Sequence, residues 1–442
     1  MNLKQLLSRA RGLEIDGETK AALIDLIEQA HGGLVFEDKP EPLEKRLQNE
    51  TPIFIEVSER AVLSDNEAPS HILIEGDNLH ALTCLAFTHE RAVDVIYIDP
   101  PYNTGNKDFR YNDRYVDKED GYRHSKWLSF MSKRLRIAKQ LLKDTGVIFI
   151  SIDDNEQAQL KLLCDGIFGQ ENIETMIWRK SGVGRDGKMK NTTTFRNDHE
   201  YVIVAFKQVK ALNKSFEKPN WENEYGNPDN DPRGAYKAGS ISRKESASNP
   251  NHSNYYTVFS PTGKSFTRQF DVSKDKFNEL DKDNRIYWGK DKSAVPAIKI
   301  FVNEEREVTT SSLIDDKFAT TTIGSKQLIE ILSDDNIGEK VRPKPMELIR
   351  KIVQISTNNS ALILDFFAGS GTTMHAVMQF NAEDGGNRQC ILVTDNENGI
   401  AEEVCYERCK RVIQGYTNAR GAQVAGLTRN HLRYYRTGFV EK

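Results

Sequence analysis

A short run in the first half of the chain combines the residue types that chemistry at an amino group requires. Residues 96–103 read Ile-Tyr-Ile-Asp-Pro-Pro-Tyr-Asn. An aromatic amine such as N6 of adenine is a poor nucleophile, because its lone pair is delocalised into the ring. The Asp99 carboxylate and the Pro100 carbonyl could accept hydrogen bonds from its two N–H groups and favour a pyramidal nitrogen. Pro100 and Pro101 lack backbone donors and fix the chain, so this carbonyl can point into a site.

Tyr102 completes the candidate catalytic motif, because its ring could stack on the face of a base. The amino group of a base is out of reach inside a duplex, so the base would first have to leave the helix. A stiff turn that merely caps a strand is the structural alternative, but it gives no reason for the acidic Asp99. The motif therefore predicts a reaction at an exocyclic amine.

A second candidate site lies much further along the chain, where residues 361–373 read Ala-Leu-Ile-Leu-Asp-Phe-Phe-Ala-Gly-Ser-Gly-Thr-Thr. A strand that runs through a glycine-bearing loop into a helix brings backbone close to a ligand. No Lys follows Gly371, so this is not the phosphate loop of an ATPase. Asp365 disfavours a phosphate but suits an ammonium or a hydroxyl group, and S-adenosylmethionine offers both. Taken alone, the loop is nearly as compatible with a tight turn that binds nothing.

The elements around both motifs alternate between strand and helix. Strands are expected at residues 72–74, 93–98, 147–152, 361–364 and 390–394, and helices at 78–89, 127–142 and 346–356. This alternation is typical of an α/β protein with a doubly wound, mostly parallel, Rossmann-like sheet. Ligands bind at the carboxyl ends of the strands in such sheets, where Asp99 and Asp365 both fall. A further carboxylate, Asp395 or Glu397, follows the last of these strands and could hold a ribose diol.

The chain divides into four segments. Residues 1–50 are expected to form an N-terminal helical segment and linker, and the polar stretch 34–70, which Pro40 and Pro42 interrupt, is interpreted as a linker. Residues 51–206 hold the catalytic half of the sheet. Residues 207–330 are rich in Pro, Asn, Asp, Ser and Gly, which predicts an inserted, loop-rich domain with brief strands such as 255–260. Residues 331–442 hold the cofactor half and a C-terminal tail.

Composition favours a globular protein of a reducing, cytosolic compartment. No apolar run is long enough to span a membrane, and the start lacks the apolar core of a signal peptide. The five cysteines are scattered, and Cys405 and Cys409, one helical turn apart, are expected on a helix surface and not at a metal. The net charge of −4 gives no general support to nucleic-acid binding, so DNA binding would need a local basic patch.

The two motifs, in this order, resemble the beta class of amino-methylating DNA methyltransferases. In that class the catalytic motif precedes the cofactor motif, and a target-recognition domain lies between them. Residues 99–102 are similar to its catalytic tetrapeptide, in which Asp favours N6-adenine and N4-cytosine enzymes usually carry Ser. Residues 365–372 are similar to its cofactor loop, and residues 75–78 to the short motif before the catalytic strand. Lys344-Pro345 resembles the Lys-Pro element that completes the methionine pocket.

Three further segments resemble the modification subunit of type III restriction-modification systems. They are Ser-Ile-Asp-Asp-Asn-Glu at 151–156, Pro-Asp-Asn-Asp-Pro-Arg-Gly at 228–234, and Arg-Ile-Tyr-Trp-Gly-Lys at 285–290. The resemblance covers roughly residues 70–415. It implies transfer of a methyl group from S-adenosylmethionine to N6 of adenine in a short duplex sequence, with no metal and no covalent enzyme intermediate.

The resemblance also implies site residues and partners. Catalysis falls to Asp99, Pro100, Pro101 and Tyr102. Cofactor binding falls to Asp77, Asn78, Lys344, Pro345, Asp365, Phe366, Phe367, Gly369, Ser370, Gly371, Thr372 and either Asp395 or Glu397. Double-stranded DNA, a second copy of the chain and a nuclease-helicase restriction subunit are the expected partners, and no membrane is expected.

The resemblance suggests a role for a basic run between Trp178 and Glu200, because this run could bind DNA phosphates near the flipped base. It carries three acidic residues and six basic ones, namely Arg179, Lys180, Arg185, Lys188, Lys190 and Arg196. A solvated loop is the alternative for such a run. Phe195, His199 and Tyr201 are expected to be packing residues.

Other acceptors stay open at this point: N4 of cytosine, RNA, or a protein glutamine amide. A protein acceptor usually goes with Asn in place of Asp99, and the large insertion favours duplex DNA. A non-enzymatic DNA-recognition subunit, or one active only with a partner, is the alternative from another class. A vestigial fold would require a damaged motif, and both motifs are intact. The recognition sequence depends on which side chains of the insertion reach base edges.

Overall fold

A computed structural model describes most of the chain. The described residues are 3–17, 19–21, 23–24, 27, 34–37, 40–64, 67–106, 108–111, 114–181, 195, 197–217, 225–302, 304, 306–315, 319–334, 337 and 341–442.

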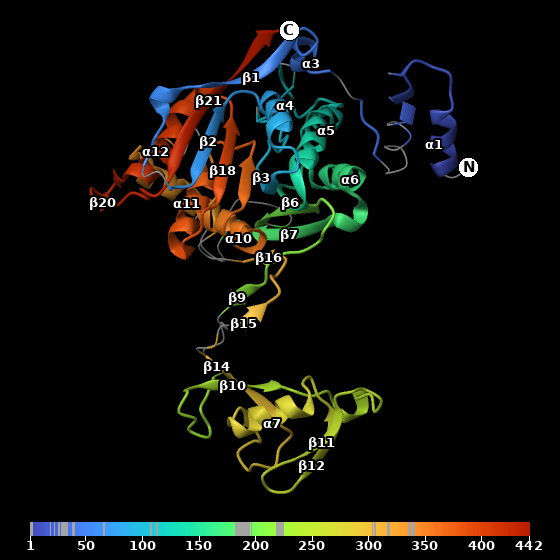
Figure 1. The fold of residues 1–442 in the computed structure, drawn as a ribbon, viewed down its shortest axis with the longest axis vertical. Coiled ribbons are helices and arrows are strands. Elements are labelled where there is room, and N and C mark those ends of the chain that lie inside the picture. Colours follow the sequence, from blue (N-terminus) through green and yellow to red (C-terminus); the bar gives the residue numbers. More distant parts are fainter. Residues whose placement is uncertain are drawn as a thin grey trace. The chain divides into compact units, whose positions relative to one another are not determined.

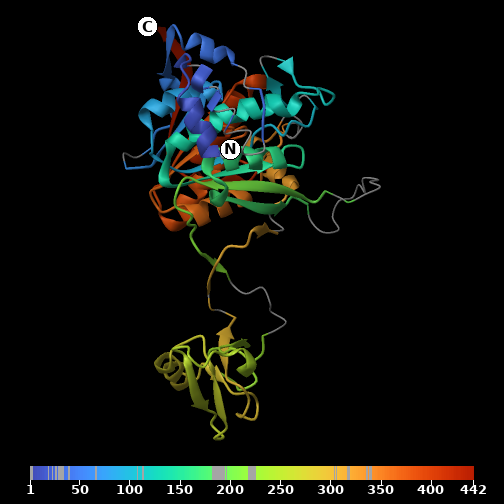
Figure 2. The same ribbon diagram turned by 90° about the vertical axis from the view of Figure 1, so that its right-hand side faces the viewer.

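The chain forms two compact units. Unit 1 comprises residues 1–213 and 310–442, and unit 2 comprises residues 214–309. The chain enters and leaves unit 2 through the green and orange connecting segments visible in Figure 2. Unit 2 lies within the range 207–330 that the sequence assigns to an insertion, while residues 310–330 contribute a strand and a helix to unit 1.

Unit 1 is built on one large sheet (Figure 1), to which ten strands of the described residues belong. In spatial order they are β1 (Glu50–Glu56), β21 (His431–Glu441), β2 (Ser70–Glu75), β18 (Gln389–Thr394), β17 (Leu362–Asp365), β3 (Val93–Ile98), β6 (Leu142–Ile152), β8 (His199–Phe206), β7 (Ile173–Arg179) and β16 (Leu313–Ile314). Most neighbouring pairs are parallel. The pairs β1–β21, β6–β8 and β7–β8 are antiparallel.

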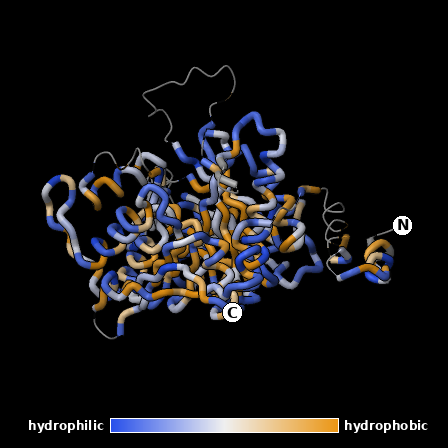
Figure 3. Tube along the Cα trace, turned by 90° about the horizontal axis from the view of Figure 1, so that it is seen from above, coloured by the Kyte–Doolittle hydropathy of each residue, from blue (hydrophilic) through white to orange (hydrophobic). Residues whose placement is uncertain are grey.

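Helices cover both faces of this sheet, as the doubly wound prediction requires. One hydrophobic core joins the sheet to α8 (Thr321–Leu332), α10 (Met346–Ser356), α11 (Thr372–Asp384), the π-helix η6 (Ile400–Tyr406) and α12 (Glu407–Gln414). The other core joins it to α4 (Asn78–Thr88), α5 (Arg123–Leu141) and α6 (Gln157–Phe168). Seen from above in Figure 3, hydrophobic segments gather at the centre and hydrophilic segments surround them. The predicted α/β fold class is therefore confirmed.

The adjacency of β3 and β17 is the feature of the sheet that matters most for the site. These strands pair in parallel, with Ile363 opposite Val95 and Leu364 opposite Ile96. Their carboxyl ends therefore meet at one edge, although Asp99 and Asp365 lie far apart in sequence. Separated stretches of the chain thus bring the two motifs together, as predicted.

Apolar periodicity located the central elements well. Helix α10 has the predicted bounds, and β3 matches the predicted strand 93–98. The helices predicted at 78–89 and 127–142 correspond to α4 and α5, of which α5 begins four residues earlier. The predicted strand 390–394 corresponds to β18.

Three expectations about the periphery are wrong. The stretch 34–70 is no simple linker, because it holds α3 (Pro42–Arg46) and β1. The predicted C-terminal tail contains a strand of the large sheet, because β21 lies between β1 and β2. Cys405 and Cys409 are fully buried and not on a helix surface, because η6 and α12, which carry them, pack against the glycine loop at Gly371.

Short elements complete unit 1. They are α1 (Leu3–Arg11), the hairpin of β4 (Arg110–Tyr111) and β5 (Arg114–Tyr115), and the hairpin of β19 (Tyr416–Thr417) and β20 (Gln423–Val424). None of the helices in the described ranges is long and apolar enough to cross a membrane.

Unit 2 has its own small core and several short strands. β10 (Tyr236–Ser240), β14 (Ala297–Phe301) and β13 (Ile286–Tyr287) form one sheet, and β11 (Tyr255–Phe259) pairs with β12 (Ser265–Gln269). β9 (Ser215–Glu217) pairs with β15 (Arg306–Val308). Helix α7 (Lys274–Lys282) contributes Phe277 to a core with Phe270 and Trp288.

Candidate active site

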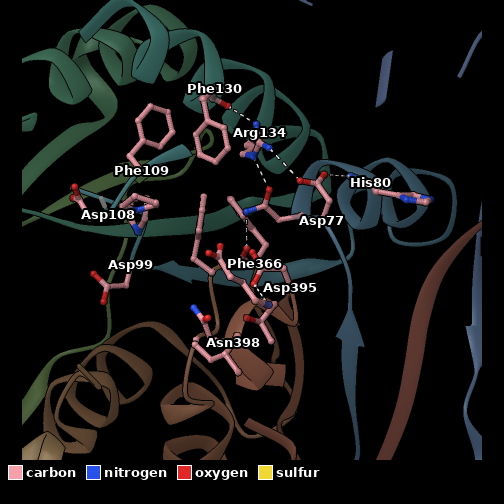
Figure 4. A pocket seen from close by; sticks show the side chains of 18 of the residues that line it. Asp77, His80, Asp99, Asp108, Phe109, Phe130, Arg134, Phe366, Asp395 and Asn398 are labelled. Atoms are coloured by element: carbon pink, nitrogen blue, oxygen red, sulfur yellow. Dashed lines mark hydrogen bonds and ion pairs between the residues drawn. The ribbon is translucent and has the colours of Figure 1, made fainter. Parts of the chain in front are cut away.

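A cavity of about 930 Å³ opens at the carboxyl edge of the large sheet (Figure 4). It gathers residues from both sequence motifs and from the segment between β2 and α4. The predicted site residues in its lining are Asp77, Asn78, Asp99, Pro100, Pro101, Phe366, Phe367, Gly369, Asp395 and Glu397. The other predicted catalytic and cofactor-binding residues are not part of this lining; they are Tyr102, Lys344, Pro345, Asp365, Ser370, Gly371 and Thr372.

The catalytic motif leaves β3 in a conformation that neighbouring elements fix. The indole N–H of Trp127, a fully buried residue of α5, donates to the Pro101 carbonyl at 2.7 Å. Asn103 follows with a φ of 55°, in the left-handed region that Asn tolerates better than most residues. The loop therefore turns sharply after Tyr102 and presents Asp99 at its start to the cavity.

Glu156 supports this turn from the segment after β6. It is fully buried, and its Oε1 accepts from Asn103 Nδ2 at 2.5 Å and lies 2.7 Å from His124 Nδ1. Burial raises the pKa of Glu156, although its contacts with Asn103 and His124 oppose that rise. The segment 151–156 thus acts on the catalytic loop through its last residue.

A compact charged cluster surrounds Asp99. Lys344 Nζ lies 3.1 Å from Asp99 Oδ1, 2.6 Å from the Tyr102 hydroxyl oxygen and 3.0 Å from Glu200 Oε2. The Tyr102 hydroxyl lies 2.9 Å from Asp99 Oδ1 and 3.0 Å from Glu200 Oε2. Lys180 Nζ lies 3.4 Å from Glu200 Oε1. The predicted Lys-Pro residue Lys344 therefore contacts the catalytic motif.

Burial and charge act against each other in this cluster. Burial raises the pKa of Asp99, and Glu200 adds to the rise, while Lys344 opposes it. Burial would also raise the pKa of Glu200, but Lys344 and Lys180 outweigh it and lower that pKa. Burial disfavours the charged form of Lys344, yet the two carboxylates raise its pKa overall. Glu200 and Lys344 are thus charged near neutral pH.

The glycine loop after β17 is organised around Asp365, which is 2% exposed. Its Oδ1 accepts from the Phe367 N–H at 3.0 Å, and its Oδ2 accepts from the Thr373 hydroxyl at 2.5 Å. Burial raises the pKa of Asp365 to about 7. Gly371 has a φ of 76°, and a Cβ there would lie 3.0 Å from Cys405 Sγ, so conformation and space both favour glycine.

A buried arginine braces the same loop from α12. Arg408 is fully buried, and its Nη1 donates to the Ser370 and Thr372 hydroxyl oxygens at 3.2 and 2.7 Å. Its Nη2 lies 3.3 Å from His375 Nδ1. Burial lowers the pKa of Arg408 to about 10, which still leaves it charged at neutral pH. Ser370 and Thr372 thus serve the shape of the loop.

The wall opposite the glycine loop is held by a second buried arginine. Arg134 of α5 donates to both carboxylate oxygens of Glu41, at 2.8 and 3.0 Å, and to Asn78 Oδ1 at 2.6 Å. Asn78 in turn donates to the Phe366 carbonyl at 3.1 Å, and Asp77 caps α4 by accepting from the backbone N–H of His80. Figure 4 shows Arg134 pointing toward Asp77. The N-terminal segment around Glu41 is therefore part of the cavity.

Asp395 and Glu397 both line the cavity after β18. Asp395 Oδ1 accepts from the Glu397 N–H at 3.1 Å, and the Tyr115 hydroxyl donates to Glu397 Oε1 at 3.2 Å. The position of both carboxylates beside the cavity leaves the choice between them for a ribose open.

Only part of the basic run can be placed. Arg179 pairs with Asp315 at 2.8 Å on the surface, and Lys180 pairs with Glu200. The predicted DNA-binding residues Arg185, Lys188, Lys190 and Arg196 lie outside the described residues. His199 and Tyr201 pack ring against ring, with centroids 5.0 Å apart. Phe195 is 97% exposed, so its assignment as a packing residue is wrong.

Sequence reasoning missed five residues that shape the site: Glu41, Arg134, Glu156, Glu200 and Arg408. All five are charged residues that are buried, and most of them have apolar neighbours that face a core. Glu200 precedes the apolar run Val202–Phe206 of β8, and Arg134 lies on the apolar face of α5. Charged residues are rarely buried without a specific partner. A charged residue within an apolar run or on an apolar helix face was therefore the sequence signal that could have indicated these site residues.

The fold and the site define an α/β protein with a cavity for a small molecule and a carboxylate motif suited to an amine. The sequence profile of the N6/N4 DNA methylase family, described as DNA methylase, matches residues 93–404. The chain belongs to this family.

Individual relatives agree with this membership. The chain is 32% identical over 412 residues to the type III restriction-modification enzyme StyLTI Mod subunit of Salmonella typhimurium, across 85% of this chain and 62% of that protein. It is 32% identical over 382 residues to the type II methyltransferase M.KpnI of Klebsiella pneumoniae, across 81% of this chain and 88% of that protein. The chain thus spans less than two thirds of the StyLTI subunit.

Among solved structures, the cytosine-N4-specific PvuII DNA methyltransferase aligns with a TM-score of 0.38 and 10% identity, across 77% of this chain and 89% of that one. Because this structural similarity is weak, the fold assignment rests on the strand order of this chain.

Proposed function

We propose that this chain transfers a methyl group from S-adenosylmethionine to N6 of adenine in a short sequence of duplex DNA, as the modification component of a restriction-modification system. The observation that carries this proposal is that Asp99 lines the same cavity as Asp77, Phe367 and Asp395. An acceptor for an amine and a space for a methyl donor are thus adjacent. Membership of the DNA methylase family supports the reaction class.

The residues around the cavity fit S-adenosylmethionine in size and chemistry. A volume of about 930 Å³ lies within the usual range for small-molecule sites, roughly 300–1,000 Å³. The carboxylates of Asp77 and Asp99 suit a cationic ligand, and Asp395 or Glu397 could accept from the hydroxyl groups of a ribose. Phe367 offers an aromatic face. When bound, the cofactor would supply an electrophilic methyl group on a sulfonium.

In the proposed reaction, the residues of the catalytic motif prepare the amine. Asp99 accepts one N–H of the target nitrogen and the Pro100 carbonyl accepts the other, which favours a lone pair directed at the methyl donor. The Asp99 carboxylate would also stabilise the positive charge that the nitrogen gains as the N–C bond forms and the bond from sulfur to methyl breaks, with the neutral thioether as leaving group. The cationic amine would then release one proton to solvent. Trp127 and Glu156 hold the backbone of the loop in place, so the loop itself needs little reorganisation.

The choice of adenine follows from the acid at the start of the motif. A carboxylate at position 99 matches the adenine-specific form of the motif in the resembled class, in which Ser usually marks N4-cytosine enzymes.

We assign target recognition to the insertion, represented by unit 2. Within its segment 228–234, Asp231 is buried, and its Oδ2 accepts from Arg233 and from the fully buried Lys299, each at 2.9 Å. Asp231 and Lys299 thus hold unit 2 together, so base readout would come from exposed side chains of the unit. Arg179, at the start of the basic run, is proposed to contact phosphates.

The proposed partners are duplex DNA, a second copy of the chain and a nuclease-helicase restriction subunit. The names of several relatives as Mod subunits of type III enzymes support the last of these. Copurification with a coexpressed restriction subunit and the mass of the purified complex would test both protein partners.

Transfer of a labelled methyl group tests the reaction. The purified chain is incubated with labelled S-adenosylmethionine and duplex DNA, and the DNA is digested to nucleosides. We expect label in N6-methyl-2′-deoxyadenosine for the wild type. Label in N4-methyl-2′-deoxycytidine would contradict the proposal, as would label in RNA but not in DNA when RNA is offered in a parallel incubation.

A further inference from the structure

The acceptor oxygen of the catalytic aspartate already faces two donors. Lys344 Nζ and the Tyr102 hydroxyl lie 3.1 and 2.9 Å from Asp99 Oδ1. An ammonium group has three N–H bonds, and those of Lys344 have three acceptors: Asp99, Tyr102 and Glu200. Oδ1 of Asp99 is thus already engaged by side chains of the protein, and an amine that binds this oxygen has to displace a donor.

Glu200 gives Lys344 a second carboxylate. Its Oε2 lies 3.0 Å from Lys344 Nζ and 3.0 Å from the Tyr102 hydroxyl, and its Oε1 lies 3.4 Å from Lys180 Nζ. Lys344 could therefore lose Asp99 and still keep two of its three acceptors. Leaving a buried donor without an acceptor is costly, so Glu200 makes the exchange of partners on Asp99 feasible.

We propose that Lys344 is a stand-in donor, which the target amine displaces from Asp99, and that Glu200 is the positioning residue that retains Lys344 during this exchange. This inference rests on the proposed amine methylation. Without Glu200, the Lys344 ammonium would have Asp99 as its one carboxylate partner in the cluster. It would then compete more strongly with the target amine and would place an uncompensated positive charge beside a nitrogen that becomes cationic.

A purely structural role explains the cluster less well. Buried ion pairs add little stability compared with apolar packing, because desolvation offsets their attraction. The cluster also lies at the one motif whose carboxylate must change its partner during the proposed reaction. Its geometry is thus better accounted for by exchange on Asp99 than by folding.

Glu200→Gln removes the charge and keeps the shape of the side chain. We expect kcat for methyl transfer to fall by about 10- to 100-fold, as for loss of a charged hydrogen bond. The affinity for S-adenosylmethionine, measured by calorimetry, should stay within about twofold, since Glu200 is not in the lining of the cavity. Glu174→Gln on β7, which removes an exposed carboxylate paired with Lys210, is the matched control and should leave kcat unchanged.

The double variant Glu200→Gln/Lys344→Met distinguishes competition from folding. If Lys344 competes with the amine, removing it relieves the defect, and the double variant should be faster than Glu200→Gln alone. Losses that simply multiply in the double variant would overturn the inference, as would a Glu200→Gln enzyme with wild-type kcat. A wild-type enzyme that binds cofactor but methylates no amine would instead overturn the proposed function itself.

Discussion

Asp99 and Asp365 both lie at the carboxyl ends of neighbouring parallel strands, yet their surroundings differ. Asp99 follows β3, lines the cavity and contacts a lysine and a tyrosine. Asp365 ends β17, is almost completely buried and accepts from a backbone N–H and the Thr373 hydroxyl of its own loop. One carboxylate faces the cavity, and the other accepts hydrogen bonds within its own loop.

The position of an acidic residue at the end of a strand therefore does not by itself define its role. Sequence reasoning assigned both residues to ligand contacts. Charged partners oppose the cost of burial at Asp99, whereas neutral donors leave Asp365 with a pKa of about 7. The two loops can therefore be separated by experiment.

The largest effect is expected for Asp99→Asn. The substitution replaces a charged acceptor for the amine by the weaker, neutral amide oxygen, and it removes the charge that stabilises the cationic form of the amine. We expect kcat to fall by about 100- to 1,000-fold, while the dissociation constant of S-adenosylmethionine changes little. Rates from labelled methyl transfer and affinities from calorimetry give the two values. Retained transfer together with lost cofactor binding would reverse the roles assigned to the two loops.

Local patterns predicted the central part of the fold because its elements are defined by their own residues. The apolar periodicity of residues 346–356 and the apolar run of residues 93–98 suffice to define α10 and β3. β21 could not be found in this way, because its place depends on pairing with β1 and β2, which are remote in sequence. The place of the segment around Glu41 could not be predicted either, because it depends on the ion pair between Glu41 and Arg134 of α5.

The site was predictable to a similar extent. The motif residues that line the cavity carry their signal in a contiguous stretch. Glu200 and Arg408 reach the two motifs from other elements, and a single buried charge in an apolar stretch does not reveal which loop it will contact. Long-range polar contacts are therefore the part that local patterns leave out.

Arg408→Met tests the glycine loop without touching Asp365. The change removes the donors to Ser370 and Thr372, so we expect the loop to lose its shape and the cofactor to bind about 10-fold more weakly. Arg411→Met on the same helix is the control, because Arg411 donates to the carbonyls of Ile331 and Leu332. Equal losses of affinity in both variants would mean that the effect is a general one on α12.

Asp365→Asn tests the difference between the two aspartates through the pH dependence of the free energy of unfolding. The pKa of Asp365 is raised from an ordinary value near 4 to about 7, so the folded protein holds this proton more tightly than the unfolded chain. Its contribution to the free energy of unfolding is present at low pH and is lost as pH rises from about 4 to 7. Asparagine does not titrate, so the variant should lose less stability than the wild type over this range. Denaturant unfolding at several pH values measures the difference, and parallel curves would contradict the burial of a protonated carboxyl.

The smallest effect is expected for Arg179→Ala, outside both loops. Arg179 is on the surface and pairs with Asp315, so its removal should spare cofactor binding and kcat. We expect DNA to bind slightly more weakly whatever its sequence, with the salt dependence of binding reduced by about one phosphate contact. A loss confined to one sequence would instead indicate a base contact.

The most direct test of the central claim is sequencing with detection of modified bases, on DNA from cells that express this chain alone or its Asp99→Ala variant. We expect N6-methyladenine at one short sequence, present with the wild type and absent with the variant. Unmodified DNA from cells in which the wild-type protein is folded and binds S-adenosylmethionine would contradict it, as would methylation that persists without Asp99.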